Sequence, residues 1–105
     1  MENINLDKTA FQITLHGGNA KDLANDALVA AKKGDYEQAE QLLAEANKEF
    51  DLGHQVQSKA MQKDDSDNRI VPTLLLVHAK DHLMAAKTEI KLINELIDLH
   101  KKLDK

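Results

Sequence analysis

Apolar residues recur at intervals of three and four along most of the chain, and this spacing predicts three long amphipathic helices. The first helix is expected from about Asp7 to Lys33, and the third from Thr73 to Leu103. Between them, Gly34-Asp35 joins a residue typical of helix C-termini to a preferred N-cap, which predicts a short turn into a second, antiparallel helix. The apolar positions that define the three helices are Phe11, Leu15, Leu23, Ala24, Ala27, Leu28, Ala31, Tyr36, Ala39, Leu42, Leu43, Ala46, Phe50, Val56, Ala60, Met61, Leu74, Leu75, Leu76, Val77, Leu83, Met84, Ile90, Leu92, Ile93, Leu96, Ile97, Leu99 and Leu103.

Two short segments interrupt this pattern. Gly17-Gly18 lies inside the first helix, where each glycine costs about 1 kcal/mol relative to alanine, so the pair predicts a kink or a close approach of another backbone. Gln62 to Arg69 is polar, contains an acidic run at residues 64–67 and has no apolar periodicity, which predicts a solvated loop. Pro72 suits the first turn of the third helix. The up-down-up order predicts an all-α fold, an antiparallel three-helix bundle that forms one domain over residues 1–105.

The third helix is more apolar than a single buried face requires. Leu74 to Val77 fills a complete turn with large apolar side chains, so this turn needs cover on all sides. Two neighbouring helices of the same chain leave one side uncovered, and a second copy of the chain would supply the rest. The pattern therefore predicts an oligomer that assembles through the third helix, with closed rotational symmetry as the usual outcome.

Composition excludes several classes of function. The chain has no cysteine, which rules out disulfides, thiolate metal sites and cysteine nucleophiles, and which fits a cytoplasmic location. The net charge is −4 with both signs interspersed, and Arg69 is the only arginine, so nucleic-acid binding is not expected. No apolar run is long enough to span a membrane, and no basic leader with a cleavage site opens the chain. A cytoplasmic protein is therefore expected.

The segment from Val77 to Met84 carries the candidate chemistry. His78, Asp81 and His82 follow one another at helical spacings of three and four residues, so they lie on adjoining parts of one helix surface. Polar side chains on an otherwise apolar helix cost free energy unless they are paired or used. We therefore place the candidate functional site here.

Several chemistries compete for this site. His78 and His82 with Asp81 between them approximate the His-x-x-Glu-His pattern of some zinc peptidases, but the acid is one methylene shorter and no further ligand is evident. A carboxylate-bridged di-iron bundle needs Glu-x-x-His pairs, and the chain contains none. Two readings remain. The histidines could be purely structural, at a subunit interface or in a polar core layer where hydrogen bonds satisfy them, or one histidine could be a nucleophile that carries a phosphoryl group.

From about Phe11 to Leu103 the chain resembles the lactose/cellobiose-type enzyme IIA of the bacterial sugar phosphotransferase system. The segment Val77–Met84 carries most of the resemblance, in both its residues and their spacing. Residues 1–10 are a variable N-terminal segment in this comparison and carry none of it. The other matching segments are Gly18-Asn19-Ala20, Ala30–Tyr36, His54–Lys59 and Glu95–His100.

The resemblance implies a phosphotransferase component with a phosphohistidine intermediate on His78. It would accept the group from the histidine-containing phosphocarrier protein and pass it to a cysteine of enzyme IIB. His82 and Gln57 would orient the phosphate. Asp81 would meet its symmetry mates around a magnesium or similar divalent ion on the axis of a homotrimer. Converging carboxylates need such a cation, and their oxygen ligands suit magnesium.

The implied physiological role is uptake of a β-linked disaccharide such as cellobiose, chitobiose or lactose. The resemblance does not indicate which of these sugars is transported. Contact with the membrane would be indirect, through the IIB and IIC parts of the permease. A different class of function remains open beside it: a non-catalytic helical adaptor that oligomerises, with the cluster of His78, Asp81 and His82 as a structural interface.

Overall fold

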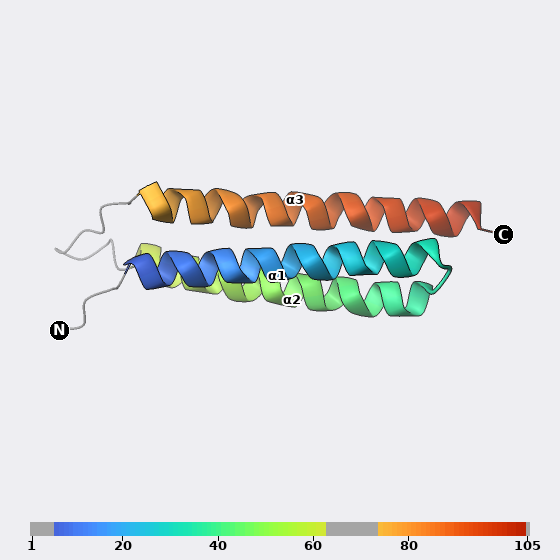
Figure 1. Cartoon of the computed structure of the whole chain (residues 1–105), viewed down its shortest axis with the longest axis horizontal. Coiled ribbons are helices and arrows are strands. Elements are labelled where there is room, and N and C mark those ends of the chain that lie inside the picture. The colour runs from blue at the N-terminus through green and yellow to red at the C-terminus, as the bar shows by residue number, and fades with distance from the viewer. Residues whose placement is uncertain (1–5, 63–73, 105) are drawn as a thin grey trace.

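Three long helices run side by side along one axis (Figure 1). This computed structural model describes residues 6–62 and 74–104, which form α1 (Leu6–Lys32), α2 (Tyr36–Gln62) and α3 (Leu74–Leu103). The predicted all-α three-helix architecture is confirmed, and α1 begins and ends within one residue of the expected positions. Helix α2 includes Gln62, while the rest of the predicted acidic loop and Pro72 lie outside the described residues.

Each helix buries one stripe of residues spaced alternately three and four apart, which is the spacing of a left-handed bundle. Alanine dominates the stripe of α1, so its neighbours pack close to its backbone, whereas α3 supplies leucine and isoleucine. The buried core residues of the three stripes are Ala10, Ile13, Gly17, Ala20, Ala24, Ala27 and Ala31 of α1, Ala39, Leu43, Ala46, Phe50, Gly53 and Ala60 of α2, and Leu76, Ala79, Leu83, Ala86, Ile90, Ile93 and Ile97 of α3.

The turn between α1 and α2 has the predicted chemistry. Gly34 has a φ of 84°, a conformation that glycine adopts without steric cost, and the Asp35 carboxylate accepts a hydrogen bond from the Gln38 backbone N–H at 3.1 Å. The Tyr36 hydroxyl lies 2.9 Å from a carboxylate oxygen of Asp104, beyond the end of α3. The turn thus caps two helices and holds the end of the third.

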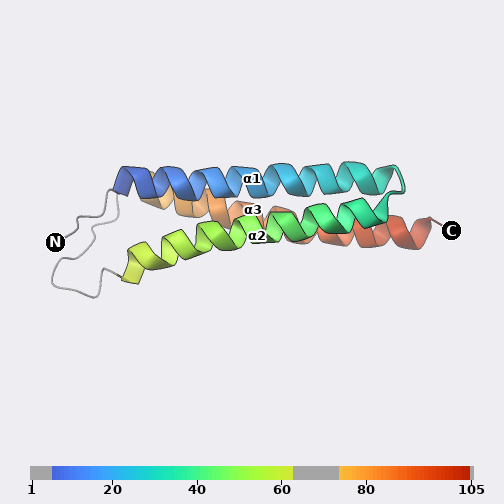
Figure 2. The same ribbon diagram turned by 90° about the horizontal axis from the view of Figure 1, so that it is seen from below.

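Helix α1 is continuous through Gly17-Gly18 and runs without a break (Figure 2). The expectation of a kink is therefore wrong, and the alternative of a close approach is correct at Gly17, which is buried against α3. The packing of neighbouring helices at this level outweighs the modest intrinsic cost of the two glycines in a helix.

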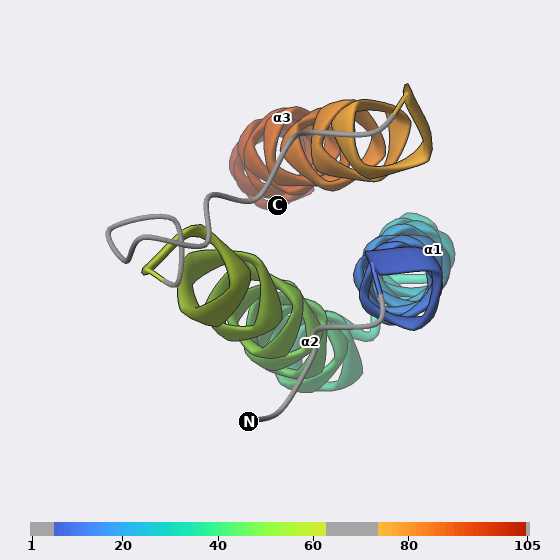
Figure 3. The same ribbon diagram turned by 90° about the vertical axis from the view of Figure 1, so that its left-hand side faces the viewer.

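Helix α1 packs along both other helices, whereas α2 and α3 diverge at the end where α1 begins (Figure 3). Several large apolar residues of α3 remain uncovered in the single chain: Leu74 is 87% exposed and Leu103 is 75% exposed. Only Leu76 of the apolar turn predicted from Leu74 to Val77 is buried. Within the described residues, no helix is both long enough and apolar enough to cross a lipid bilayer.

Candidate functional site

His78 and His82 lie one turn apart on α3 with their imidazole rings nearly parallel. The ring centroids are 6.4 Å apart, and the angle between the ring planes is 17°. His78 is exposed, whereas His82 is half-buried. A helix turns by about 100° per residue, so Asp81 points directly away from the core stripe that contains Leu83, while His82 lies on the flank beside α1. His78 lies between these two directions.

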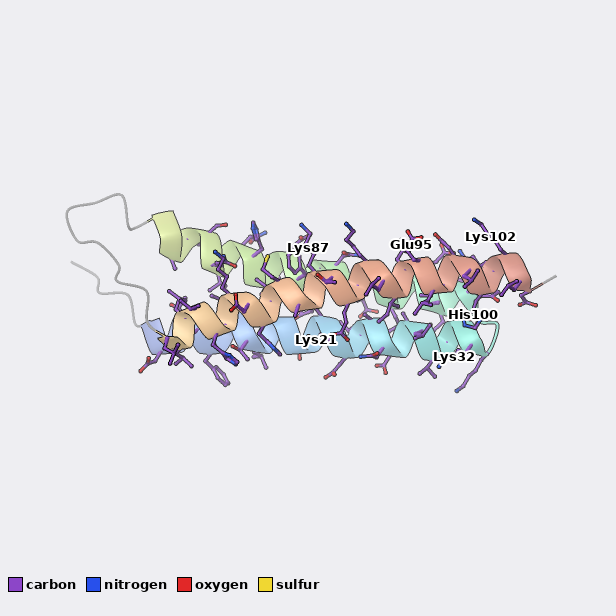
Figure 4. All side chains as sticks on the ribbon, turned by 90° about the horizontal axis from the view of Figure 1, so that it is seen from above. Lys21, Lys32, Lys87, Glu95, His100 and Lys102 are labelled. Atoms are coloured by element: carbon purple, nitrogen blue, oxygen red, sulfur yellow. The ribbon has the colours of Figure 1, made fainter. Side chains whose placement is uncertain are left out.

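The surroundings of His82 come from α1 as well as α3. The Cδ2 atom of its ring lies 3.3 Å from where a Cβ at Gly17 would be, so the ring edge rests against the α1 backbone. Farther along the same groove, Lys21 Nζ of α1 and Glu89 Oε2 of α3 form an ion pair at 3.6 Å. Lys21 and Lys87 lie on opposite sides of α3, with Lys21 on the α1 side (Figure 4). The groove between α1 and α3 therefore holds one imidazole and one ion pair.

This environment favours the neutral form of His82 by lowering its pKa. Burial lowers the pKa of His82, and the positive charge of Lys21 and the neighbouring His78 lower it further, against an opposing effect of Glu89. A neutral imidazole has one N–H donor and one unprotonated ring nitrogen. The site therefore presents an exposed imidazole that a partner can reach, with a second, anchored imidazole one turn away as a hydrogen-bond donor.

Such an arrangement suits a nucleophilic histidine and an anionic group attached to it. An exposed imidazole nitrogen can attack an electrophile carried by another protein without a deep pocket. Transfer of a phosphoryl group depends mainly on positioning and on donors for its oxygens, which a neighbouring N–H supplies. His78 and His82, predicted as nucleophile and phosphate-orienting residue, lie side by side on α3, and these two roles stay predictions.

Asp81 does not join the two histidines and faces solvent in the single chain. Among residues 6–62 and 74–104, no group of three or more His, Asp or Glu side chains is placed to hold a metal ion. One exposed carboxylate fits a divalent ion only if other copies of the chain bring theirs to the same point. The residues at the same spacing on this outer face of α3 are Leu74, Ala85, Thr88, Leu92, Leu96, Leu99 and Leu103.

Gln57 occupies an inward-facing position of α2, in the spacing that continues from Gly53 to Ala60. Its Oε1 atom is buried and has no hydrogen-bond partner among the described residues. It shares no hydrogen bond with His78 there, so its predicted phosphate-orienting role stays a prediction. His54 lies on the same helix, three residues before Gln57. Its ring stacks on that of Phe50, with the ring centroids 6.0 Å apart and an angle of 23° between the ring planes.

Sequence reasoning missed the contributions of Lys21 and Glu89, because nothing in the local pattern places two residues of different helices beside His82. It also missed the contact between His16 of α1 and Glu49 of α2, whose Nδ1 and Oε1 atoms lie 3.0 Å apart. The Gly17-Gly18 pair did indicate a kink or a close approach of another backbone. It did not indicate that the residues in contact would be His82 and Leu83 of α3.

The chain matches the family model described as the lactose/cellobiose-specific IIA subunit of the PTS system over residues 8–101. It is 40% identical over 101 residues to the lichenan-specific phosphotransferase enzyme IIA component of Bacillus subtilis, a match that covers 96% of this chain and 92% of the relative. It is 36% identical to the N,N'-diacetylchitobiose-specific EIIA component of Escherichia coli K12, with 93% and 84% covered.

Solved structures with the same fold include the PTS cellobiose-specific enzyme IIA of Bacillus anthracis. That chain superimposes with a TM-score of 0.89 at 34% identity, over 98% of this chain and 94% of its own length. The E. coli chitobiose IIA protein, solved in solution in complex with HPr, gives a TM-score of 0.87 at 33% identity, over 98% and 100% of the two chains. These likenesses extend over the whole bundle, including the helix that carries His78.

Proposed function

The chain belongs to the lactose/cellobiose-specific IIA family of the sugar phosphotransferase system, and we propose that it carries the phosphoryl group of this system on His78. The membership confirms the resemblance that rests on residues Val77–Met84. The observation that carries the assignment to His78 is its exposed ring, parallel to the half-buried ring of His82 one turn away. His82 is then the donor to the phosphoryl oxygens.

The proposed reaction has two transfers of the same group. First, an unprotonated ring nitrogen of His78 attacks the phosphorus of a phosphohistidine on the donor protein. The new N–P bond forms as the donor's N–P bond breaks, so that PO₃⁻ passes across and the donor leaves as neutral imidazole. Next, a cysteine thiolate of the acceptor attacks the same phosphorus, and the bond to His78 breaks. His78 returns as neutral imidazole, and the acceptor holds a phosphocysteine.

The donor in this proposal is the histidine-containing phosphocarrier protein HPr, and the acceptor is enzyme IIB. The E. coli relative in complex with HPr supports the first assignment. A cytoplasmic location follows from these partners, and contact with the membrane is indirect, through IIB and the IIC permease. Both partners must reach the same exposed histidine, so they dock in turn on one surface.

Two exposed apolar residues of α1, Phe11 and Leu15, lie at about the same height along the bundle as His78. Gly17 lies opposite Leu83, and the two helices run in the same direction, so Phe11 and Leu15 lie level with residues 77–81 of α3. Phe11 is 66% exposed and Leu15 is 49% exposed. Exposed apolar side chains beside a reactive group are typical of a protein docking surface. We assign this pair to the docking surface for the two partners.

The proposed assembly is a homotrimer through the outer face of α3. Leu92, Leu96 and Leu99 are each at least 43% exposed in the single chain, and their spacing suits a coiled coil. Asp81 lies on the same face, three turns before Leu92, so an axis along this face brings the Asp81 carboxylates of three copies together. A magnesium or similar divalent ion would neutralise the three charges there, and the reaction at His78 uses no ligand of that ion.

In this proposal the transported sugar is a β-linked disaccharide. The permease, which binds the sugar, determines which disaccharide it is. Relatives named for lichenan, N,N'-diacetylchitobiose and oligo-β-mannoside are 40%, 36% and 33% identical to this chain. Similar identity to proteins of different sugar systems is expected for a component that handles the phosphoryl group and never touches the sugar.

The test is incubation with phosphoenolpyruvate, enzyme I and HPr, followed by intact mass measurement at neutral and at acidic pH. The expected product is one acid-labile phosphoryl group per chain, and the His78→Ala variant should gain none. His54→Ala is the matched control, because His54 is another exposed histidine of the chain and should leave phosphorylation intact. An unchanged mass of the unmodified chain would contradict the carrier function and favour the non-catalytic helical adaptor.

A further inference from the structure

One layer of the bundle core is filled in an unusual way. The inward-facing positions of this layer are Gly17 of α1, Gly53 of α2 and Leu83 of α3, so two of the three have no side chain. A Cβ at Gly17 would lie 3.5 Å from the Leu83 Cα, and one at Gly53 would lie 2.9 Å from the Leu83 Cδ1. Leu83 is completely buried. Both other helices therefore close directly onto α3 at the residue that follows His82.

The contact at Gly17 involves the candidate site as well as the core. The nearest atom to a Cβ at this position is Cδ2 of His82, at 3.3 Å, which is closer than an ordinary van der Waals contact. Gly18, the next residue of the same helix, has no atom within 4 Å of the equivalent point. The space beside Gly17 is therefore filled by the His82 ring and the α3 backbone, whereas the space beside Gly18 is open.

We propose that Gly17 is a positioning residue for phosphoryl transfer, because its lack of a side chain lets the His82 ring lie against α1, parallel to His78. The inference rests on the proposed function of His78. The ring edge of His82 and the backbone of α3 both lie close to the same glycine, so the space at Gly17 limits how far the His82 ring can move toward α1. Its N–H is thereby held at a set distance from a group attached to His78.

A small displacement of His82 is enough to matter for the reaction. Phosphoryl transfer gains most of its rate from positioned donors, and misplacing a group by about 1 Å can lower a rate by about a hundredfold. A methyl group at Gly17 must push the ring or α3 away by a few tenths of an ångström. The expected loss is therefore smaller, about three- to tenfold in the rate of transfer within the complex.

The experiment compares Gly17→Ala with Gly18→Ala in the whole protein. Both variants replace a helical glycine by alanine in the same turn, so their intrinsic effect on the helix is the same. In ¹H–¹³C spectra of the histidine rings at one fixed pH, Gly17→Ala should shift the His82 signals, and those of His78 to a smaller extent. Gly18→Ala should leave both rings unchanged. Unchanged His82 signals in Gly17→Ala would overturn the positioning role, whether or not the chain carries phosphate.

The second measurement is the kinetics of phosphorylation by HPr. Gly17→Ala should lower kcat by about three- to tenfold and leave KM within about twofold, because the docking surface is untouched. In a His82→Ala background, the same glycine substitution should have no further effect, since the group that Gly17 positions is gone. An equal loss in both backgrounds would overturn the proposal in favour of a general structural role.

Folding of the variants is followed by thermal unfolding. If Gly17→Ala alone does not fold, the Gly17→Ala/His82→Ala pair removes the contacted ring and should recover a cooperative transition. Failure of that recovery would contradict a contact that acts through His82. If the unmodified protein gained no phosphate, the function proposed for His78 would be overturned. The ring spectra would still test the contact between Gly17 and His82, because they are recorded without phosphorylation.

Discussion

Leu83 of α3 occupies the space that a side chain at Gly53 of α2 would need. A Cβ at Gly53 would lie 2.9 Å from the Leu83 Cδ1 and 3.0 Å from the His16 Cβ. The leucine methyl can move by rotation, but the His16 Cβ is attached directly to the α1 backbone. The close packing of all three helices at this level therefore depends on glycine at this position.

Gly53→Ala should lower the free energy of unfolding by about 1–2 kcal/mol. Two contacts of 3.0 Å or less place the overpacking cost in the upper part of its usual range, at about 2–3 kcal/mol, and the better helix propensity of alanine returns about 1 kcal/mol of this. Chemical denaturation followed by circular dichroism measures the change. Gly18→Ala is the control and should stabilise the protein by up to about 1 kcal/mol, because nothing crowds its new methyl group. Equal effects of the two substitutions would show that Gly53 is not crowded.

Gln57→Leu should raise the free energy of unfolding by about 1 kcal/mol. The Oε1 atom of Gln57 is buried without a partner among the described residues, so an apolar side chain of similar size removes an uncompensated desolvation cost. Denaturant unfolding gives the stability. The predicted phosphate-orienting role requires the same variant to accept phosphate from HPr about tenfold more slowly. A more stable variant with an unchanged rate would remove Gln57 from the site.

The Glu49 carboxylate should make the stability of the bundle sensitive to acid. It accepts hydrogen bonds from His16 Nδ1 at 3.0 Å and from Asn19 Nδ2 at 3.1 Å, and the bond from His16 is the main reason that the pKa of Glu49 is lowered. A carboxyl group with a lowered pKa in the folded state stabilises the protein above its unfolded pKa. That contribution is lost as the pH falls through the folded pKa.

Glu49→Gln should therefore reduce the loss of stability between about pH 5 and pH 3. The effect is below about 1 kcal/mol, because both side chains of the pair are about a quarter exposed. Unfolding temperatures measured across this range test the prediction. Glu45→Gln is the control, since Glu45 is an exposed carboxylate of the same helix and should leave the pH profile unchanged. Parallel profiles for the unmodified chain and Glu49→Gln would contradict the prediction.

Asp81→Leu should abolish stoichiometric divalent metal binding and leave a trimer. In the proposed trimer, the substitution replaces the three Asp81 carboxylates at the axis by apolar side chains that continue the outer face of α3. Metal content after gel filtration and mass by light scattering test both parts. Asp98→Leu is the control, because it removes an exposed carboxylate of the same helix outside the face that Asp81 shares with Leu92. Persistent metal in Asp81→Leu would exclude the proposed axial ligand.

Leu15→Gln should weaken docking of HPr without changing the chemistry at His78. The expected result is a several-fold increase in KM with little change in kcat, because an apolar contact that forms on association is lost. Val29→Gln is a matched control. Val29 is also 49% exposed on the outer side of α1 but lies near the opposite end of the helix. An equal effect of both substitutions would mean that Leu15 has no special place in the docking surface.

The periodicity of apolar residues was sufficient to predict three helices, their order and the turn at Gly34-Asp35. These features depend on contacts between residues three or four apart and on the chemistry of single caps, which are local in the chain. The segment Val77–Met84 likewise identified the family, and the comparisons confirm it. His78 and His82 share a helix surface as their spacing requires.

The relations between helices were decided only by the tertiary structure. The contact of Gly17 with His82, the ion pair of Lys21 with Glu89, and the burial of the Gln57 Oε1 atom all depend on the axial shift and rotation of one helix against another. Packing of whole side-chain layers sets these two quantities, so no short segment contains them. The same packing keeps α1 straight through two adjacent glycines where local propensity alone predicted a possible kink. The sequence by itself therefore determined the helices and the candidate histidine, His78, and the packing of the three helices determined what surrounds that histidine.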